Sequence, residues 1–153
     1  MTLTLLLATN NPHKVEEFRS IFLPYPVILQ TPADLGLVND VDESGNTYFE
    51  NARLKAQAYW QEGQNMVLAD DSGLEVKALE GAPGIHSHRF LPDPNATSRD
   101  RCLYLLEHLK SSPRPWRASF HCEVVLLTRQ GTIFTSHGVC TGQIIPEFSG
   151  ENG

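Results

Sequence analysis

The sequence predicts an α/β protein with a mixed central sheet flanked by helices. Two apolar runs, residues 3–9 and residues 66–69, have the composition of strands that are buried on both faces of a sheet. Two segments between these runs repeat apolar residues at helical spacing, and Asn-, Pro- and Gly-rich turns separate them. This order of strand, helix, strand, helix and strand is typical of an α/β sheet, and a hairpin pattern near the end adds an antiparallel part.

Composition and charge exclude several classes of protein. The 153 residues suffice for a sizeable core, and we expect a single domain over residues 1–153. With 12 basic and 18 acidic side chains the net charge is −6, and no basic stripe indicates nucleic-acid binding. No apolar run approaches the roughly 20 residues of a membrane helix, and the first residues lack a secretory pattern. Three cysteines without a CxxC motif indicate reduced, buried thiols in a cytoplasmic protein: Cys102, Cys122 and Cys140.

The first helix has clear boundary residues. Asn11 can cap it, Pro12 suits its first position, and two further prolines end it before residues 27–29, which form a short strand. Its apolar face consists of Val15, Phe18 and Phe22. Residues 30–47 read as a loop with one turn of helix near Ala33.

The second helix begins after Thr47, the predicted N-cap. Glu50 stands three residues later, which completes the pattern of a capping box. Gly63 is expected to end the helix. The face predicted to be buried consists of Phe49, Ala52, Ala56 and Tyr59.

The strand of residues 66–69 is expected to end at the polar residues 70–73. Residues 74–78 then alternate between apolar and charged side chains, as a half-buried strand does. Glycines and prolines predict a loop over residues 81–94.

A third helix and a hairpin complete the chain. Thr97 or Ser98 can cap the helix, which continues through Lys110. The side chains expected to face inward are Cys102, Leu103, Leu106 and Leu109. Residues 117–128 and 132–141 are predicted to form the hairpin.

The residues that join the first strand to the first helix form the first candidate site: Thr9, Asn10, Asn11, Pro12, His13 and Lys14. Free backbone N–H groups and the positive end of the helix dipole meet there and favour an anion such as phosphate. Lys14 in the first turn opposes the dipole at a cost of roughly 0.3–1 kcal/mol, which a bound phosphate would turn into an attraction. The alternative is a polar loop with a solvated lysine, since the glycines of a Walker loop are missing.

The second candidate site consists of Asp70, Asp71, Ser72 and Gly73 at the end of a buried strand. Ligand sites of open α/β sheets lie at such ends. Adjacent carboxylates in a strand point to opposite faces, so one can face the site, hold Mg²⁺ and accept a proton from water, while backbone donors hold the other. One alternative is a simple turn. Another is the aspartic protease signature, which requires two such aspartates and therefore a homodimer of this chain.

An acidic loop before the second helix forms a third candidate site. Its members are Asp40, Asp42 and Glu43, together with Glu50 and Asn51 on the helix. Mg²⁺ takes one or two carboxylates and completes its shell with substrate phosphate, so this loop can supply a ligand. The alternative is a solvated acidic loop. Asn51 and Lys55 share one helix face, where they either reach a ligand or face water.

The loop of residues 81–94 is the fourth candidate. Arg89 suits phosphate or carboxylate. His86 and His88 have no matching His or Cys nearby in the sequence, so a metal site is not favoured there.

Several motifs in this order resemble those of one family, the inosine/xanthosine triphosphate pyrophosphatases, or HAM1-like noncanonical purine NTP pyrophosphatases. The segments that carry the resemblance are residues 8–14 (ATNNPHK), 43–47 (ESGNT), 49–52 (FENA) with Lys55 and Ala56, 69–74 (ADDSGL), 81–85 (GAPGI), Arg89 and 120–122 (FHC). The resemblance implies an ITPase-like (HAM1/Maf-like) fold that lacks the family's C-terminal segment.

The resemblance also implies an activity. The chain would use Mg²⁺ to hydrolyse purine nucleoside triphosphates with deaminated bases, such as dITP and XTP, to the monophosphate and pyrophosphate. Residues 9–14 would cradle the triphosphate and Ser72 would contact the substrate. Asp71 would bind Mg²⁺ and accept the proton of the attacking water, and the second metal ligand falls on Asp42, with Glu43 beside it as the alternative. A cytoplasmic homodimer that cleanses the nucleotide pool is implied as well.

The sequence departs from the family pattern in two places. His86 and His88 stand where relatives commonly carry Tyr and Ala. The resemblance covers only the front and middle of the family's length, because relatives continue with a Phe-Gly-Tyr-Asp segment, a later Lys and a Ser-His-Arg. We therefore expect an exposed sheet edge. The alternative to an enzyme is a non-catalytic fragment that retains triphosphate binding or a dimer surface.

Overall fold

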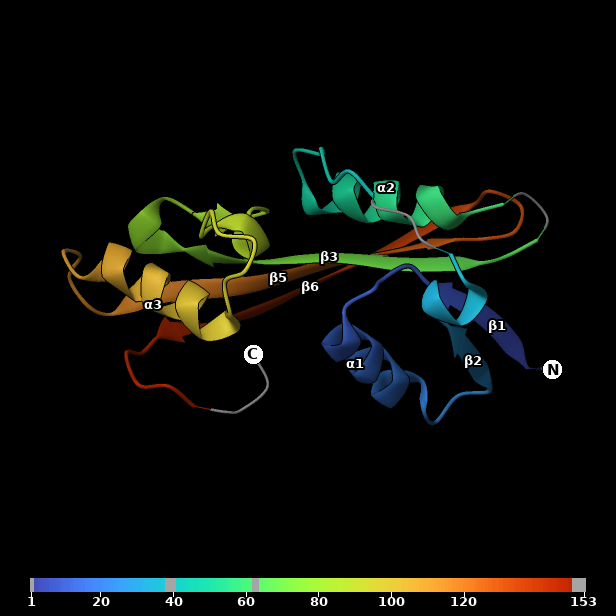
Figure 1. The fold of residues 1–153 in the computed structure, drawn as a ribbon, viewed down its shortest axis with the longest axis horizontal. Helices are drawn as coiled ribbons and strands as arrows, with labels where there is room; N and C mark the ends of the chain where they lie inside the picture. Colours follow the sequence, from blue (N-terminus) through green and yellow to red (C-terminus); the bar gives the residue numbers. More distant parts are fainter. Residues whose placement is uncertain (1, 38–40, 62–63, 150–153) are drawn as a thin grey trace. The chain divides into compact units, whose positions relative to one another are not determined.

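The computed structural model describes residues 2–37, 41–61 and 64–149 (Figure 1). Its sheet has the strand order β2-β1-β3-β5-β6, and β4 pairs with β3 outside this path. The strands are β1 (Leu3–Leu7), β2 (Val27–Gln30), β3 (Val67–Val76), β4 (Pro83–Gly84), β5 (Trp116–Leu127) and β6 (Ile133–Ile144). The α-helices are α1 (Pro12–Phe22), α2 (Tyr48–Tyr59) and α3 (Ser98–Leu109), and the short 3-10 helices are η1 (Ala33–Leu35), η2 (Lys77–Leu79) and η3 (Ser87–Arg89).

The sheet is mixed, as the sequence predicted. Strand β1 runs parallel to both of its neighbours, and its last residue, Leu7, pairs with Leu68 of β3. Strand β4 is antiparallel to β3. Residues 128–132 join the neighbouring strands β5 and β6 in a tight turn, where Gly131 adopts a φ of +80° that favours glycine.

The chain divides into two compact units. Unit 1 contains the described residues up to Asp71 together with residues 123–137, and unit 2 contains the described residues of 72–122 and of 138–149. The boundary crosses β3, β5 and β6, so each of these strands contributes to both units. The single domain expected over residues 1–153 stays a prediction.

Two helices cover opposite faces of the sheet in unit 1 (Figure 1). Leu7 and Leu68 pack against Phe18 of α1 on one face. The other face packs against α2 through Leu6, Ala8, Val67, Ala69, Ala52, Ala56 and Tyr59. Because consecutive residues of β1 are buried on both sides, the run of apolar residues that predicted a doubly covered strand is confirmed. The predicted apolar face of α2 is confirmed too, with Phe49 partly buried against the same cluster.

The core of unit 2 corrects the predicted orientation of the third helix. Leu105 and Leu109 of α3 are buried against Val76 and Trp116. Cys102 and Leu103, which were expected to face inward, are exposed. The buried residues all lie in the C-terminal half of α3, so its first turn extends beyond the core cluster. The cysteine prediction was also partly wrong, because Cys140 is exposed and Cys122 only half-buried, although all three thiols are free.

The helix starts follow the predicted capping residues. The Asn11 side chain accepts a hydrogen bond from His13 N–H at 3.0 Å, and Pro12 occupies the first turn. Thr47 accepts from Glu50 N–H at 3.1 Å, but the Glu50 carboxylate accepts from Asn46 N–H at 2.6 Å instead of closing a capping box. Helix α2 ends at Tyr59, and Gly63, its predicted end, lies outside the described residues.

Strand β3 is longer than predicted. It continues through Asp70, Asp71 and Ser72 to Val76, so the interpretation of this segment as a turn was wrong. The glycine that suggested a turn has another role, because a Cβ at Gly73 would collide with the carbonyl oxygen of Gly84 on β4. Glycine is therefore needed for β4 to approach β3, and Ala78, expected in the strand, lies in η2.

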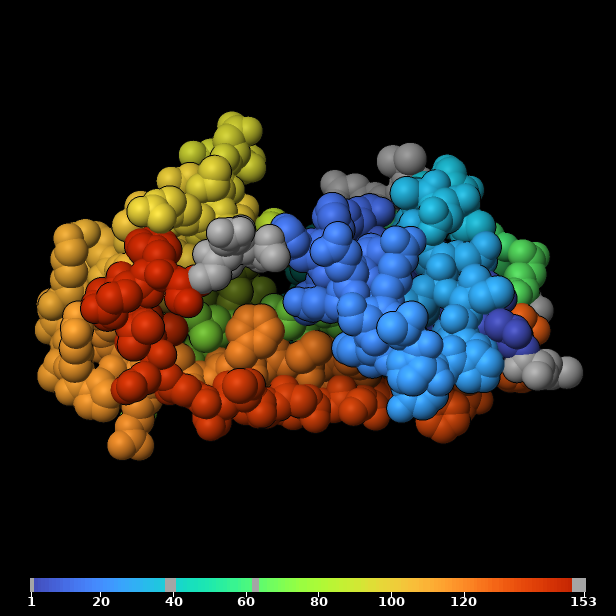
Figure 2. Space-filling model, turned by 90° about the horizontal axis from the view of Figure 1, so that it is seen from below, coloured from blue at the N-terminus to red at the C-terminus, as the bar shows by residue number. Residues whose placement is uncertain are grey.

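Strand β6 lies at one end of the strand order, and nearly all of its residues are exposed. Figure 2 shows its orange and red atoms uncovered along the surface. Phe134 and Val139 are among its exposed apolar residues. The exposed sheet edge expected from the sequence is therefore present. Among the described residues, no helix has the length and apolar character needed to cross a bilayer.

The two-sided burial of β1 generates a stability prediction. Replacing the fully buried Leu7 by Ala should lower the free energy of unfolding by about 2–5 kcal/mol, because it removes apolar contacts and leaves a cavity. The matched control is Leu3→Ala in the same strand, where the residue is 39% exposed and the loss should be less than half as large. Urea unfolding of both variants measures this, and equal losses would contradict the burial argument.

Candidate functional site

The predicted anion loop lies where β1 ends beside β3. Leu7 of β1 pairs with Leu68 of the parallel strand β3. Thr9 follows Leu7 by two residues, and Asp70 follows Leu68 by two residues. Thr9 Oγ1 accepts from Asn11 N–H at 3.2 Å, which shapes the entry into α1. Residues 10–13 are exposed, and the first turn of α1 contains no acidic residue that would neutralise the positive end of its dipole. The loop is therefore open to an anion from solvent.

Lys14 is not a solvated lysine of a polar loop. Its Nζ lies 2.9 Å from Oδ2 of Asp70, and the two side chains are 22% and 5% exposed. A more distant carboxylate, that of Glu17, lies 3.8 Å from the same Nζ. The buried partner offsets the cost of placing a cation at a helix start, so Lys14 is held in position at the end of β1.

Asp70 and Asp71 contact different helices. Asp70 meets Lys14 of α1, whereas Asp71 accepts from Asn51 Nδ2 at 3.2 Å and from Lys55 Nζ at 3.1 Å, both on α2. Side chains of consecutive strand residues point to opposite faces, and the contacts agree with this expectation. The expectation that backbone donors hold the second carboxylate is corrected, because the ammonium group of Lys14 holds it.

Two carboxylates converge on Lys55. Its Nζ lies 3.1 Å from Oδ1 of Asp71 and 3.4 Å from Oε1 of Glu43. Asp42, predicted as the second metal ligand, is exposed, and the structure brings its neighbour Glu43 to this cluster instead. Asp40 of the same predicted loop lies outside the described residues.

The environment of Asp71 shifts its protonation. Burial raises the pKa of this carboxyl above its ordinary value, and the charge of Glu43 adds to the increase. The ammonium group of Lys55 and the hydrogen bond from Asn51 act in the opposite direction but do not cancel the effect of burial. A carboxylate with a raised pKa is a better proton acceptor than an ordinary aspartate.

The donor set suits a hard divalent cation. In the described part of the chain, no three His, Cys, Asp or Glu side chains gather as a complete metal site. Mg²⁺ does not need one, because it commonly takes one or two carboxylates and keeps water and substrate phosphate as its other ligands. Glu43 and Asp71, which already share one cation in Lys55, fit that requirement.

The helix spacing left open whether Asn51 faces water or the interior, and the structure shows that it is buried. The residue is only 2% exposed, and its amide bonds to Asp71 rather than facing water. The signal in the sequence was the i, i+4 spacing of Asn51 and Lys55, which places both on the same helix face. Spacing alone could not show that this face meets Asp71.

The remaining predicted residues lie in unit 2. Ser72 is half-buried and directly follows Asp71 in β3. In the loop after β4, Ser87 accepts from Leu74 N–H at 2.8 Å and donates to Gly84 O at 2.6 Å, so this segment has a structural role. His86 directly precedes the short helix η3, and Arg89 is the last residue of that helix.

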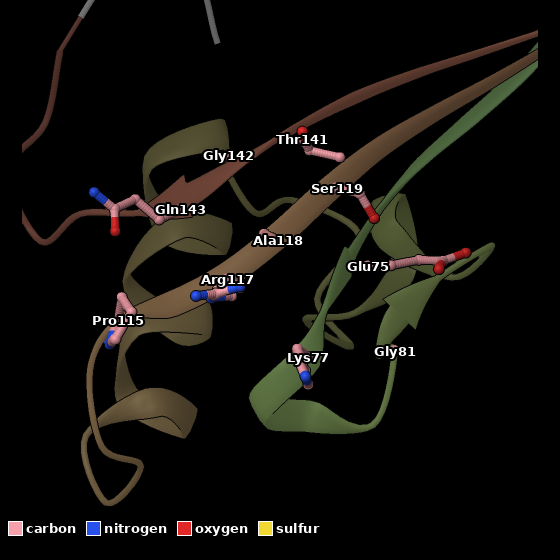
Figure 3. A pocket seen from close by; sticks show the side chains of 10 residues that line it. All are labelled: Glu75, Lys77, Gly81, Pro115, Arg117, Ala118, Ser119, Thr141, Gly142 and Gln143. Carbon is pink, nitrogen blue, oxygen red and sulfur yellow. The ribbon is translucent and has the colours of Figure 1, made fainter.

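A pocket of about 750 Å³ lies within unit 2. Figure 3 shows Lys77, which begins η2 directly after β3, and Arg117 on β5 among the residues that line it. Both basic side chains belong to exposed residues, and none of the predicted site residues lines the pocket. The charged cluster of unit 1, with its buried carboxylates, is therefore the candidate active site.

The raised pKa of Asp71 predicts an effect on stability in metal-free protein. The Asp71 carboxyl has a higher pKa in the folded state than in the unfolded chain, so its ionisation at pH 7 destabilises the folded state. Asp71→Asn removes this ionisation and should therefore raise the melting temperature. The destabilisation develops as the pH rises from the ordinary pKa of 3.8 through the raised pKa of the folded state, so the gain should disappear below pH 3.8. Thermal unfolding in a chelator at both pH values measures it, with Asp93→Asn as control. A lower melting temperature at pH 7 would show that pairing with Lys55 outweighs burial.

Comparisons with known proteins find similar sequences over nearly the whole chain. The model of the Ham1 family matches residues 5–153. A dITP/XTP pyrophosphatase of Thermoanaerobacter pseudethanolicus is 38% identical over 149 residues, which cover 97% of this chain and 75% of the relative. Another, from Desulforamulus reducens, is 38% identical over 151 residues and is covered over 74% of its length.

Solved structures show the same fold. A HAM1 protein from Coxiella burnetii superposes with a TM-score of 0.83 at 35% identity, over 99% of this chain and 78% of that one. The Ham1 protein of Staphylococcus aureus gives a TM-score of 0.79 at 33% identity, over 98% and 76%. These matches confirm the predicted fold class and agree with a resemblance to the front and middle of the family's length. The chain belongs to the Ham1 family.

Proposed function

We propose that the chain is a Mg²⁺-dependent nucleoside triphosphate pyrophosphohydrolase that converts dITP, ITP, XTP or dXTP to the monophosphate and pyrophosphate. The observation that carries the proposal is that the carboxylates of Glu43 and Asp71 converge on the ammonium group of Lys55. The exposed N-terminus of α1 belongs to the same unit. The names of the relatives, dITP/XTP pyrophosphatases, support the substrate class. The reaction would remove noncanonical purine nucleotides from the nucleotide pool.

Residues 9–14 would bind the triphosphate. The N-terminus of α1 presents positive dipole charge without a competing acidic side chain in its first turn. Lys14 adds a full positive charge whose position is set by Asp70. A phosphate group bound there would lie beside the end of β1 and close to the residues of β3 that supply the carboxylates.

Asp71 would act on water. Its raised pKa makes it a suitable acceptor for the proton of the attacking water. The water oxygen forms a bond to the α-phosphorus as the bond from that phosphorus to the bridging oxygen breaks, and pyrophosphate leaves with the electron pair. Ser72, next in the strand, would contact the substrate.

Glu43 and Asp71 would hold the metal ion. When bound, Mg²⁺ neutralises the charge that develops on the phosphate oxygens. Lys55 holds the two carboxylates close together, because its ammonium group lies within 3.4 Å of both and offsets their mutual repulsion. We favour Glu43 over Asp42 because Glu43 is the residue that contacts Lys55.

The proposal includes a homodimer that works in the cytoplasm. The dimer rests on the family resemblance, and the cytoplasmic location rests on the three free cysteines, which form no CxxC motif. Light scattering during gel filtration would measure the dimer directly.

The proposed activity predicts release of pyrophosphate and a loss of turnover when Asp71 is replaced. The chain should release pyrophosphate from dITP in Mg²⁺ at a higher kcat/KM than from dATP. Asp71→Asn should reduce kcat about 10²–10⁴-fold because the proton acceptor is lost, whereas Asp93→Asn should have little effect. If calorimetry shows that ITP binds but no pyrophosphate appears, the chain is the non-catalytic alternative.

The choice between the two adjacent acidic residues can be tested in the same assay. Glu43→Gln should raise the Mg²⁺ concentration that gives half-maximal rate by about 10–100-fold, as loss of a metal-site group does. Asp42→Asn, one residue away and exposed, should leave it within about threefold. The reverse pattern would restore Asp42 as the ligand.

A further inference from the structure

Asn51 lies at the centre of the candidate site without being one of its charged groups. It is among the fully buried side chains of the molecule, and a buried amide must satisfy its hydrogen-bonding groups within the protein. Its Oδ1 accepts from Gly45 N–H at 2.8 Å, and its Nδ2 donates to Asp71 Oδ2 at 3.2 Å. A backbone N–H can only donate and an ionised carboxylate can only accept, so the two contacts fix the orientation of the amide.

Gly45 is the residue that lets the acidic loop approach α2. A Cβ at this position would lie 2.7 Å from Asn51 Oδ1 and 2.7 Å from Glu50 Cβ. Asn46 N–H also donates to the Glu50 carboxylate, at 2.6 Å. The loop is therefore fastened to the first turn of α2 two and three residues after Glu43.

These contacts close a ring around the two carboxylates. Asn51 binds one oxygen of Asp71, and Lys55 binds the other oxygen and reaches Glu43. Glu43 is joined through the backbone to Gly45, which returns to Asn51. Asn51 and Lys55 are one helical turn apart, so a single rigid helix face determines where both carboxylates lie.

We infer that Asn51 is a positioning residue whose amide holds the acidic loop against Asp71, so that Glu43 and Asp71 are arranged as a metal-binding pair before the metal arrives. The side-chain contacts of Asn51 go to Gly45 and Asp71, so it acts on the site through these groups. The inference rests on the proposed function for the identity of the reaction, but the link from loop to carboxylate exists in the protein without a ligand.

Asn51→Leu is the main test, because leucine has a similar volume and removes both hydrogen bonds. The matched control is Asn65→Leu: Asn65 also joins two groups, accepting from Gln61 N–H at 2.8 Å and donating to Tyr59 O at 2.8 Å, beyond the other end of α2. Mn²⁺ binding, followed by electron paramagnetic resonance, should weaken about 10–100-fold in the Asn51 variant and stay within about threefold in the control.

Two further readouts separate positioning from a general loss of structure. Hydrogen exchange of the Gly45 amide in metal-free protein should be at least about tenfold faster in Asn51→Leu than in Asn65→Leu. With dITP at saturating Mg²⁺, kcat should fall about 10–100-fold while KM stays within about threefold. Mn²⁺ affinity and kcat that both remain within threefold of the parent in folded Asn51→Leu would overturn the inference.

Gly45→Ala disturbs the hydrogen bond between Gly45 and Asn51 from the side of the acidic loop. It replaces Asn51→Leu as the test if that variant does not fold. It should weaken Mn²⁺ binding in the same direction, whereas Gly138→Ala, where a Cβ would meet nothing within 4 Å, should not. The variant that combines Asn51→Leu with Gly45→Ala should bind Mn²⁺ no more weakly than the single variant with the lower Mn²⁺ affinity, because both changes break the same hydrogen bond. Fully additive losses of Mn²⁺ affinity would contradict this. Mn²⁺ binding and exchange need no turnover, so an inactive parent would refute the proposed function and leave the test of Asn51 intact.

Discussion

The burial of two adjacent carboxylates in one strand is the constraint on which the site depends. Asp70 and Asp71 are 6% and 7% exposed, and a buried carboxylate without a partner is strongly unfavourable. Because consecutive side chains of β3 point to opposite faces, one cation could not serve both. The structure supplies Lys14 from α1 on one face and Lys55 from α2 on the other. The two ion pairs thereby fix both helices against β3 at the level where the neighbouring strand β1 ends.

Under the proposed function, the start of α1 would explain how a chain with a net charge of −6 attracts a polyanion. The positive charge offered to an anion is local and lies at the start of α1, in the dipole of that helix and the lysine of its first turn, whereas Lys55 is matched by two carboxylates. Net charge describes the whole surface, whereas binding depends on the field at one site. A divalent cation held by oxygen ligands adds to that field and bridges acidic side chains to phosphate.

The division of the chain places nearly all of this chemistry in one unit. Glu43, Asn51, Lys55 and Asp71 belong to unit 1, together with Lys14, and only Ser72 belongs to unit 2. The proposed metal-binding pair and the proposed phosphate loop are therefore built from α1, α2, the loop before α2 and the strand ends beside them. Unit 2 has its own core under α3 and its own pocket.

Local features in the sequence determined the helices and their caps, because capping and apolar periodicity act over a few residues, as at Asn11 and Thr47. They also identified Lys14 and Asp71 as candidates. Only the tertiary structure could decide that Lys14 pairs with Asp70, that Glu43 rather than Asp42 reaches Lys55, and that Asp70–Gly73 continues a strand instead of turning. Each of these outcomes depends on strand register or on close packing between distant segments, such as β4 against Gly73, and no local pattern encodes such contacts.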